Sequence, residues 1–327
     1  MMLQTTEELR PYIYGAVRIE TGEDGFLSFR RLTALQEEVL VRRGFSPREL
    51  ATAGVKLDFY ANGGEVRFDY HATRGAAVNH LEIDATVDGI ELYHFENPEQ
   101  IDVDGTVAFR VPERDGMSRV TVFFPNLAAM KIKNLVVPDG IRRAMRGTRI
   151  LMAGDSITHG YYASHPRLSY PNIVGERLNA DVLNQGIGGD KYHADNLDPE
   201  LPFDPDIITV AYGTNDWAAA IPDLAAKIDA YYARLRTIYP NTPVLAIPPI
   251  WRGKTDGVTK NGLTLEDVRN LVRDTARRYG CYIADSSRLV PPHEDFFFDK
   301  TLHPNNLGFT FYGEAVADLV NEILHRD

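Results

Sequence analysis

A serine at the end of an apolar run is the first residue in this chain whose position could support chemistry. Residues 149–153 (RILMA) are followed directly by Gly154, Asp155 and Ser156. A short apolar run that stops at a turn is typical of a buried strand, and ligands of open α/β sheets bind beyond the carboxyl ends of the strands. The hydroxyl of Ser156 could act there as a nucleophile if a base removes its proton. Asp155 and Ser156 could instead form only the turn and the N-cap of the next helix.

Three later segments add polar groups of the kinds that acyl transfer uses. Residues 184–190 (NQGIGGD) and 212–216 (YGTND) each follow a strand-like run, and residues 299–305 (DKTLHPN) lie near the C-terminus. His303 in the last segment is the candidate base, although it could also serve only to turn the chain into the final helix. The remaining histidines lack metal-ligand spacings such as His-Glu-x-x-His, so the sequence predicts no metal and no cofactor.

In this order, the four segments resemble the signature blocks of the SGNH (GDSL-type) esterases and lipases, a family named for its Ser, Gly, Asn and His. The resemblance extends from about residue 148 to the C-terminus. It implies that Ser156 is the nucleophile and His303 the catalytic histidine. It also implies an oxyanion hole made by the backbone N–H groups of Ser156 and Gly189 and the side-chain amide of Asn215. The residue types agree with these roles, because glycine permits close approach and asparagine supplies an N–H₂ donor. A plain glycine turn and an Asx-turn asparagine are the structural alternatives.

The acid of the triad departs from the family pattern. The family places an aspartate three residues before the histidine, but Lys300 occupies that position and cannot accept a hydrogen bond from the imidazole. Asp299, four residues before His303, is the predicted acid, and it would need a one-residue bulge to reach the ring. A backbone carbonyl is the main alternative partner, as in some carbohydrate esterases of the family, and Asp295 is a further candidate.

The elements that must position these groups alternate between strands and helices from residue 149 onward. Five strand-like runs are separated by segments with helical periodicity, including a helix from the cap Thr264 to Tyr279 and a last helix from about Leu307. The last helix is predicted to point Phe311, among others, inward. This alternation predicts a flavodoxin-like, doubly wound α/β domain with a five-stranded parallel sheet, here assigned to residues 148–327. The SGNH resemblance implies the same architecture.

Residues 1–140 show a different pattern and are predicted to form a β-sandwich of jelly-roll type. Short alternating runs such as 66–70 (VRFDY) and 81–87 (LEIDATV) are separated by turn signals such as Asp88-Gly89. A helix from Leu32 to about Val41 is predicted to interrupt these strands, with Leu35 on its buried face. This helix is predicted to cover one end of the sandwich. A basic link at residues 142–147 (RRAMRG) is predicted to be a solvated segment.

The order of these two domains bears on the substrate. A β-sandwich before an SGNH domain resembles the family 2 carbohydrate esterases, which deacetylate sugars. Trp217, Trp251 and Arg252 follow the predicted strands closely and could line the substrate pocket, although core packing explains the tryptophans equally well. The sequence therefore predicts a serine esterase that removes a short acyl group, most simply acetyl, from a carbohydrate or similar small alcohol. An acyltransferase with the same site and a non-catalytic carbohydrate-binding protein are the alternatives.

Composition limits the class of protein and its partners. The chain has 327 residues, 44% hydrophobic and 25% charged, as is usual for a soluble globular protein. A net charge of −11 disfavours nucleic acid and anionic membrane as main partners but does not select a substrate. The SGNH resemblance implies a small acyl ester as the partner. The N-terminal residues lack a signal-peptide pattern, so a cytoplasmic enzyme is expected. The single cysteine, Cys281, excludes an intramolecular disulfide and lies in an apolar run typical of a buried strand.

Overall fold

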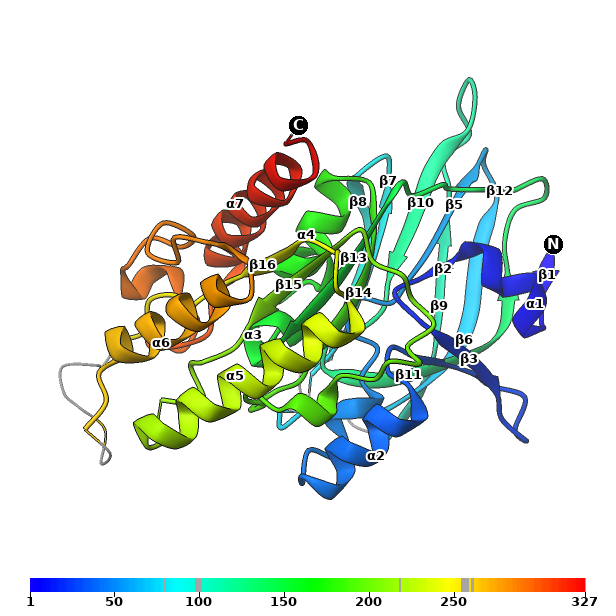
Figure 1. Ribbon diagram of the computed structural model, residues 1–327. Coiled ribbons are helices and arrows are strands. Elements are labelled where there is room, and N and C mark those ends of the chain that lie inside the picture. The colour runs from blue at the N-terminus through cyan, green and yellow to red at the C-terminus, as the bar shows by residue number, and fades with distance from the viewer. Residues whose placement is uncertain (79, 98–101, 218, 254–258, 260–261, 327) are drawn as a thin grey trace.

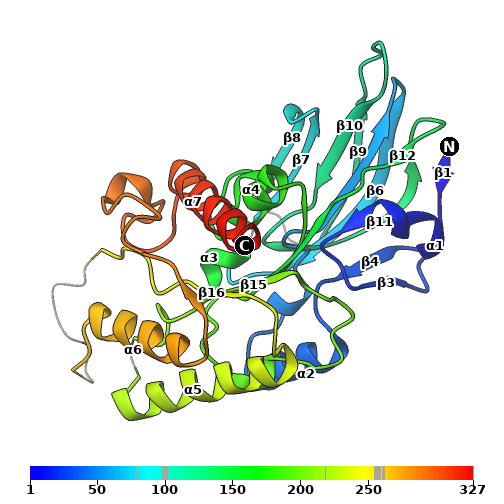
Figure 2. The same ribbon diagram turned by 45° about the horizontal axis from the view of Figure 1, so that its top comes forward.

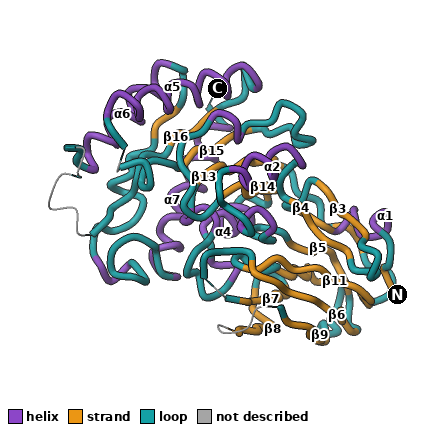
Figure 3. Tube along the Cα trace, turned by 90° about the horizontal axis from the view of Figure 1, so that it is seen from below, coloured by secondary structure: helices purple, strands orange, loops and turns teal. Residues whose placement is uncertain are grey.

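The chain folds into two antiparallel sheets and one parallel sheet with helices on both of its faces (Figure 1). The computed structural model describes residues 1–78, 80–97, 102–217, 219–253, 259 and 262–326. The antiparallel sheets and the parallel sheet form two lobes that lie side by side, with the N-terminus at the outer end of the first lobe (Figure 3). None of the described helices is long and apolar enough to cross a membrane.

The two antiparallel sheets pack face to face as a β-sandwich, as predicted. In the first sheet, the strand order is β3-β4-β11-β6-β9 with β1 beside β11, and in the second it is β12-β5-β10-β7-β8 with β2 beside β5. The strands are β1 (Met2–Leu3), β2 (Ile13–Tyr14), β3 (Arg18–Thr21), β4 (Leu27–Arg30), β5 (Lys56–Ala61), β6 (Glu65–Arg74), β7 (Leu81–Val87), β8 (Ile90–Asn97), β9 (Val103–Arg110), β10 (Ser118–Phe123), β11 (Ala128–Val136) and β12 (Arg142–Arg143).

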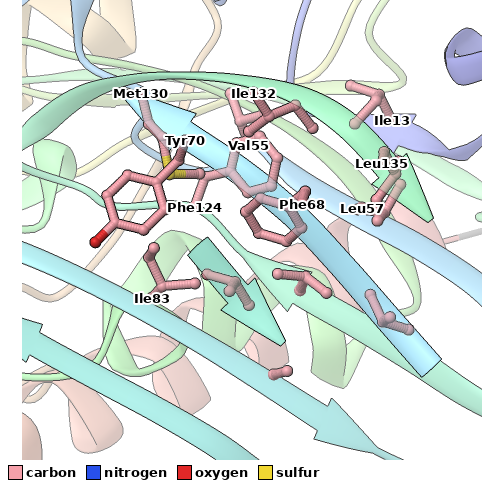
Figure 4. Packing of buried hydrophobic residues seen from close by; sticks show 14 of the residues in the cluster. Ile13, Val55, Leu57, Phe68, Tyr70, Ile83, Phe124, Met130, Ile132 and Leu135 are labelled. Carbon is pink, nitrogen blue, oxygen red and sulfur yellow. The ribbon is translucent and has the colours of Figure 1, made fainter. Parts of the chain in front are cut away.

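Alternation along the strands builds the sandwich core. In β6, Val66, Phe68, Tyr70 and Ala72 are buried and their neighbours are not. Such period-two burial places every second side chain between the sheets. Phe68, Phe124 and Ile83 pack there among other apolar side chains (Figure 4).

The parallel sheet has the predicted flavodoxin-like order. Its strands run β14-β13-β15-β16-β17, so that the first strand of this domain lies between the second and the third. The five strands are β13 (Thr148–Gly154), β14 (Ala180–Gly186), β15 (Ile207–Ala211), β16 (Val244–Ala246) and β17 (Tyr282–Ile283). Cys281, just before β17, is a buried free thiol.

Helices cover both faces of the parallel sheet (Figure 2). On one face, α4 (Tyr170–Arg177) packs against α7 (Asn306–Leu324), and on the other α5 (Ile221–Ile238) packs against α6 (Leu265–Arg278). A capping box between Thr264 and Asp267 begins α6, as predicted. The remaining helices and turns are α1 (Thr6–Leu9), α2 (Ala34–Arg42), α3 (Ser156–His159) and the 3₁₀ turns η1 (Arg10–Tyr12), η2 (Arg48–Leu50), η3 (Pro166–Leu168), η4 (Ala194–Asn196) and η5 (Glu294–Phe296).

Two helix faces differ from the prediction. Leu35 in α2 is 47% exposed, whereas Gln36 is buried and hydrogen bonds to Gln185 and to the carbonyl of Asn196. α2 therefore packs against the α/β domain rather than covering an end of the sandwich. In α7, Phe311 is exposed and rests edge-on against Phe296 instead of pointing into the core. The buried face of α2 is set by its polar partners in the second domain, and hydrophobic periodicity does not reveal such partners.

The basic link between the lobes is only partly solvated, which corrects the prediction. Arg142 and Arg143 are exposed in β12, but the guanidinium of Arg146 is buried. Arg146 donates to the carboxylate of Asp58 on β5 and to that of Glu176 on α4. An ion cluster thus connects the sandwich with α4 of the α/β domain. The assignment of the boundary near residue 140 stays a prediction.

Candidate active site

Three strand ends bring the predicted site residues to one edge of the parallel sheet. Gly154 at the end of β13 lies beside Gly186 of β14 and Ala211 of β15 in the strand register. The segments with Ser156, Gly189 and Asn215 start just beyond these positions. Parallel neighbours end at a common edge, so these segments meet although they are far apart in sequence.

The turn after β13 separates the capping function from the hydroxyl of Ser156. The side chain of Asp155 accepts a hydrogen bond from the backbone N–H of Ile157 and caps α3. A Cβ atom at Gly154 would lie 2.0 Å from Oγ1 of Thr158, so only glycine fits this turn. Ser156 is the first residue of α3, and its hydroxyl remains available for another partner.

That partner is the imidazole of His303. Oγ of Ser156 lies 2.9 Å from Nε2 of His303, and Oδ2 of Asp299 lies 2.7 Å from Nδ1 of the same ring. A proton on Nδ1 donated to Asp299 leaves Nε2 free to accept the serine proton. The three side chains therefore form a continuous hydrogen-bonded chain from hydroxyl to carboxylate.

A bulge allows Asp299 to reach the ring across four positions. Lys300 has a φ of 61°, in the left-handed region. Oδ1 of Asp299 accepts the backbone N–H groups of Thr301, Leu302 and His303 at 3.0, 2.7 and 3.1 Å. One carboxylate oxygen thus holds the loop while the other contacts the imidazole. Asp295, the further candidate, instead accepts a hydrogen bond from Nζ of Lys300.

The surroundings shift the pKa values of both groups. Burial lowers the pKa of His303, Asp299 opposes this, and the nearby charge of Arg252 lowers it further. Burial tends to raise the pKa of Asp299, but the N–H donors of the loop and the His303 ring outweigh this and lower it to about 2. At neutral pH the pair is therefore a neutral imidazole beside an ionised carboxylate.

The glycine turn after β14 is held by a buried histidine. Gly189 has a φ of 83°, and the N–H of Gly188 donates to Nδ1 of His159 at 3.2 Å. Nε2 of His159 lies 2.9 Å from the backbone oxygen of Asn126 in the sandwich, which places the ring proton on Nε2. Burial keeps the pKa of His159 well below its ordinary value, so the ring stays neutral. The turn that carries Gly189 is thus fixed through both domains.

The amide of Asn215 is oriented by the same turn. Its Nδ2 donates to the carbonyl of Asp190 at 3.0 Å, and the amide group has a second N–H to offer. Asp190 itself is buried and paired at 2.8 Å with Arg43, the C-cap residue of α2. A sandwich residue therefore steadies the loop that orients Asn215.

Two of the three predicted substrate contacts lie together. The guanidinium of Arg252 stacks over the ring of Trp217 at 5.1 Å and donates to the carbonyl of Thr214 at 3.1 Å. Both residues thus border the segment with Asn215. Trp251 packs against Phe297 in the core that includes α7, which is the packing alternative considered above.

Four residues of the site were not predicted. The ring of Tyr161 stacks on His303 at 5.7 Å, and that of Tyr162 meets it edge-on at 5.1 Å. Both tyrosines follow α3 directly, and their closeness to Ser156 in the chain was a usable signal. A methyl group at Gly189 would lie 3.6 Å from both Phe45 and Arg48 of the sandwich. No local pattern connects these two residues with the site, because the contact depends on how the lobes pack.

Two clusters of histidines and carboxylates lie around β7 and β8, away from the predicted blocks, and one of them includes His165 from the segment before η3. They are Asp84 with His94 and His165, and His80 with Glu82 and Glu96. His80 touches a carboxylate through each ring nitrogen, at 3.0 Å in both cases. Burial opposes the charged ring, but both carboxylates raise the pKa of His80, as expected for an imidazolium between two acids. Ion pairing accounts for the contacts of His80.

Comparison with known proteins relates the α/β domain to a family. Residues 152–310 match the model of the GDSL-like lipase/acylhydrolase family. The acetylxylan esterase/glucomannan deacetylase of Cellvibrio japonicus is 24% identical over an alignment of 259 positions that covers 69% of this chain. The chain spans 66% of the length of that relative, just under two thirds.

Solved structures share both lobes. A salicylyl-acyltransferase from a tetracycline biosynthetic pathway matches with a TM-score of 0.79 and 20% identity over 96% of each chain. A family two carbohydrate esterase from Cellvibrio japonicus matches with a TM-score of 0.60 and 18% identity over 99% of this chain and 97% of that one. A family two carbohydrate esterase from Clostridium thermocellum, in complex with cellohexaose, matches with a TM-score of 0.59 and 15% identity over 95% and 99%. At these identities the likeness concerns the fold, including the sandwich before the α/β domain.

Proposed function

We propose that the protein, whose residues 152–310 match the model of the GDSL-like lipase/acylhydrolase family, is a serine esterase that removes a short acyl group from a carbohydrate or similar small alcohol. The observation that carries this proposal is the hydrogen-bonded chain from Ser156 through His303 to Asp299. A hydroxyl, a neutral imidazole and an ionised carboxylate in this order can move a proton and form an acyl-enzyme.

The reaction proceeds in two steps on Ser156. As Oγ attacks the acyl carbonyl, its proton moves to Nε2 of His303, which Asp299 stabilises as an imidazolium. His303 then gives this proton to the departing alcohol, and the acyl group stays on Oγ. In the second step, a water loses a proton to His303 and attacks the acyl-enzyme, and Oγ regains a proton as the acid leaves.

The negative oxygen of each tetrahedral intermediate needs fixed donors. The backbone N–H groups of Ser156 and Gly189 and the free N–H of Asn215 are proposed for this role. Contacts with His159 and Asp190 hold the glycine turn and the Asn215 amide before substrate arrives, which supports the assignment. Donors that are already oriented do not have to reorganise as the charge develops.

Acetylated carbohydrate is the proposed substrate class. The relative from Cellvibrio japonicus acts, by its name, as an acetylxylan esterase and glucomannan deacetylase. In this chain, the indole of Trp217 lies beside the Asn215 segment with the guanidinium of Arg252 over it. An aromatic face near the site suits the apolar face of a sugar ring.

Replacing the nucleophile tests the function directly. Ser156→Ala is expected to remove hydrolysis of p-nitrophenyl acetate and of acetylated methyl glycosides almost entirely, with an unchanged circular dichroism spectrum. The exposed Ser287, which contacts Asp285, provides the matched control, and Ser287→Ala should behave like the wild type. Activity of Ser156→Ala within about tenfold of the wild type, worth only ~1.4 kcal/mol of barrier, would contradict the assignment.

An acyltransferase is the second candidate. The salicylyl-acyltransferase shares the fold over 96% of each chain. Product analysis with an added alcohol acceptor separates the two. Transfer to the acceptor that exceeds release of free acid at low acceptor concentration would establish the transferase. A non-catalytic binding protein would instead fail to react with a fluorophosphonate at Ser156.

A further inference from the structure

The sandwich contributes a cationic side chain to the site beside the glycine turn. Nη1 of Arg48 would lie 3.6 Å from a methyl group placed at Gly189, and Cε1 of Phe45 would lie equally close. The Arg48 guanidinium also stacks over Phe45 at 5.5 Å. Burial raises the pKa of Tyr161, the tyrosine stacked on His303, whereas the contact with Arg48 lowers it. Arg48 therefore lies between the proposed oxyanion turn and the ring that covers the proposed base.

The backbone of Arg48 is tied to the strand that leads into this turn. Arg31, fully buried, donates to the carbonyl of Arg48 at 3.0 Å. The same guanidinium donates to the carbonyls of Asn184 and Gly186 in β14 at 2.8 and 2.7 Å. Together with the carbonyl of Ala51, which accepts from Nε, four carbonyls from two domains thus converge on one guanidinium. This arrangement fixes the position of Arg48 relative to the Gly189 turn.

The neighbouring cations have carboxylate partners, but Arg48 does not. Arg43 pairs with Asp190. Burial lowers the pKa of Arg31 to about 10, and the charges of Glu49 and Glu37 act against this decrease. Among the residues that the structure describes, no carboxylate forms an ion pair with Arg48. Its Nε is buried and has no hydrogen-bond partner among the same residues. The half-buried guanidinium contacts Tyr161 and the ring of Phe45 but has no anionic partner among the described residues, so it can still accept a negatively charged ligand.

We propose that Arg48 is a specificity residue that binds a carboxylate of the substrate, so that the preferred substrate is an acetylated sugar acid rather than a neutral acetylated sugar. A guanidinium offers paired N–H donors to a carboxylate. The chain carries a net charge of −11, which repels anions in general, so a local cation is needed to admit one. Phe45 provides an apolar wall next to it. This inference rests on the proposed esterase function and adds the charge of the substrate.

A matched pair of substrates tests the inference. Acetylated methyl glucuronide and acetylated methyl glucoside share the ring and the ester and differ in a carboxylate at C6. The wild type is expected to show a kcat/KM at least about tenfold higher for the glucuronide, which corresponds to ~1.4 kcal/mol. In Arg48→Gln, this ratio should fall close to one, mainly through KM.

The control removes the charge of a different arginine in the N-terminal lobe. Arg42 is 65% exposed in α2 and pairs loosely with Glu38, so Arg42→Gln should keep both rates and their ratio. A wild-type ratio near or below one, or an equal ratio in the wild type and Arg48→Gln, would overturn the inference. If Arg48→Gln is not folded by circular dichroism, Arg48→Lys replaces it. A lysine cannot make the paired contact, so the ratio should still fall at least about threefold, and an unchanged ratio would overturn the inference.

Hydrolysis of p-nitrophenyl acetate distinguishes a wrong role for Arg48 from a wrong assignment of the esterase function. Absence of a glucuronide preference in the wild type, together with Ser156-dependent turnover of the nitrophenyl ester, would reject only the role of Arg48. An absence of Ser156-dependent turnover would reject the esterase. Inhibition of the nitrophenyl reaction by deacetylated methyl glucuronide gives a second measurement. Its inhibition constant should rise at least about tenfold in Arg48→Gln and stay constant in Arg42→Gln.

Discussion

The two ring nitrogens of His303 have different partners, and each partner controls a different part of the proposed reaction. The contact of Nδ1 with Asp299 fixes the tautomer, whereas the contact of Nε2 with Ser156 provides the path for the proton. Burial and the charge of Arg252 keep the ring neutral before the reaction starts. The imidazole is therefore a base in the resting state and an acid only after it has taken the serine proton.

The pH profile should report this control. Since only neutral His303 can accept the serine proton, kcat/KM should be constant above the pKa of His303 and fall as the pH drops through it. Burial and Arg252 lower that pKa, so the midpoint of the acid limb should lie below 6.5. In Arg252→Gln, removal of a nearby positive charge should move the midpoint to higher pH. The exposed Arg288→Gln is the control, with an unmoved midpoint. A midpoint shifted to lower pH in Arg252→Gln would contradict this account.

Asp299→Asn tests the acceptor on the other side of the ring. The amide retains an oxygen for the loop N–H groups but loses the charge and the acceptor that face Nδ1. We expect kcat to fall by roughly 10²–10⁴, because the wrong tautomer of His303 is then favoured. Asp295→Asn, in the same loop but in contact with Lys300, should stay within a few-fold of the wild type. Similar rates for Asp299→Asn and Asp295→Asn would mean that a backbone carbonyl, rather than Asp299, accepts the hydrogen bond from Nδ1 of His303.

At the scale of elements, the loop between Asp299 and His303 shows how one extra residue is accommodated. The loop closes a narrow hairpin in which the N–H of Phe298 donates to the carbonyl of His303 at 2.8 Å. Lys300 absorbs the insertion by turning to a φ of 61°. A lysine in this conformation is strained by roughly 1–2 kcal/mol, and the Asp299 carboxylate offsets the strain by binding three N–H groups.

Two substitutions at Lys300 separate the backbone effect from the side chain. Both Lys300→Gly and Lys300→Val remove the contact with Asp295. Glycine tolerates a positive φ, so Lys300→Gly should change the free energy of unfolding by less than about 1 kcal/mol and keep kcat within a few-fold. Valine does not tolerate a positive φ. Lys300→Val should therefore lower the free energy of unfolding by about 1–3 kcal/mol, and it should lower kcat at least about tenfold because His303 is misplaced. Urea unfolding and steady-state rates provide the measurements, and equal behaviour of the two variants would exclude strain at this position.

The elements could be predicted from the sequence where local pattern and burial agree. Continuous apolar strands of the parallel sheet and the alternating strands β5, β6, β7, β9 and β10 were predicted within a few residues. β8 was not predicted, because it is a largely exposed edge strand without a regular apolar face. The blocks with Ser156, Gly189, Asn215 and His303 were identified by resemblance. Arg48 and Phe45 were not, because their position depends on the packing of two lobes that local patterns do not specify.

For the whole molecule, a buried ion cluster joins the two lobes. Lys56 and Asp58 on β5 contact Glu176 and Arg146 respectively, and Arg146 also contacts Glu176 at 2.8 Å. Burial tends to raise the pKa of Glu176, but Lys56 and Arg146 outweigh it and lower the pKa to about 2. The carboxylate therefore contributes stability above the pKa of the unfolded chain, and this contribution is lost as the pH falls toward about 2.

Removal of Arg146 should destabilise the whole molecule rather than one lobe. Both Arg119 and Arg146 contact the buried carboxylate of Asp58. Arg146→Ala leaves Arg119 as its remaining arginine partner. We expect a loss of about 3–5 kcal/mol in the free energy of unfolding in urea. Arg142→Ala, on the exposed part of the same link, should change it by no more than about 0.5 kcal/mol. A loss below about 1 kcal/mol for Arg146→Ala would mean that the cluster does not hold the lobes together.

The buried guanidinium of Arg31 also has a consequence for how the chain is made. Two of its acceptors, the carbonyls of Asn184 and Gly186, are synthesised long after Arg31 itself. At ribosomal speeds of about 5–20 residues per second, roughly 8–30 s separate them. During that interval Arg31 lacks these two acceptors, so the surface of the nascent sandwich around its guanidinium has to stay hydrated on the ribosome. Completion of the N-terminal lobe therefore waits for translation of β14, and slow codons ahead of this strand would lengthen the period in which the unfinished lobe can aggregate.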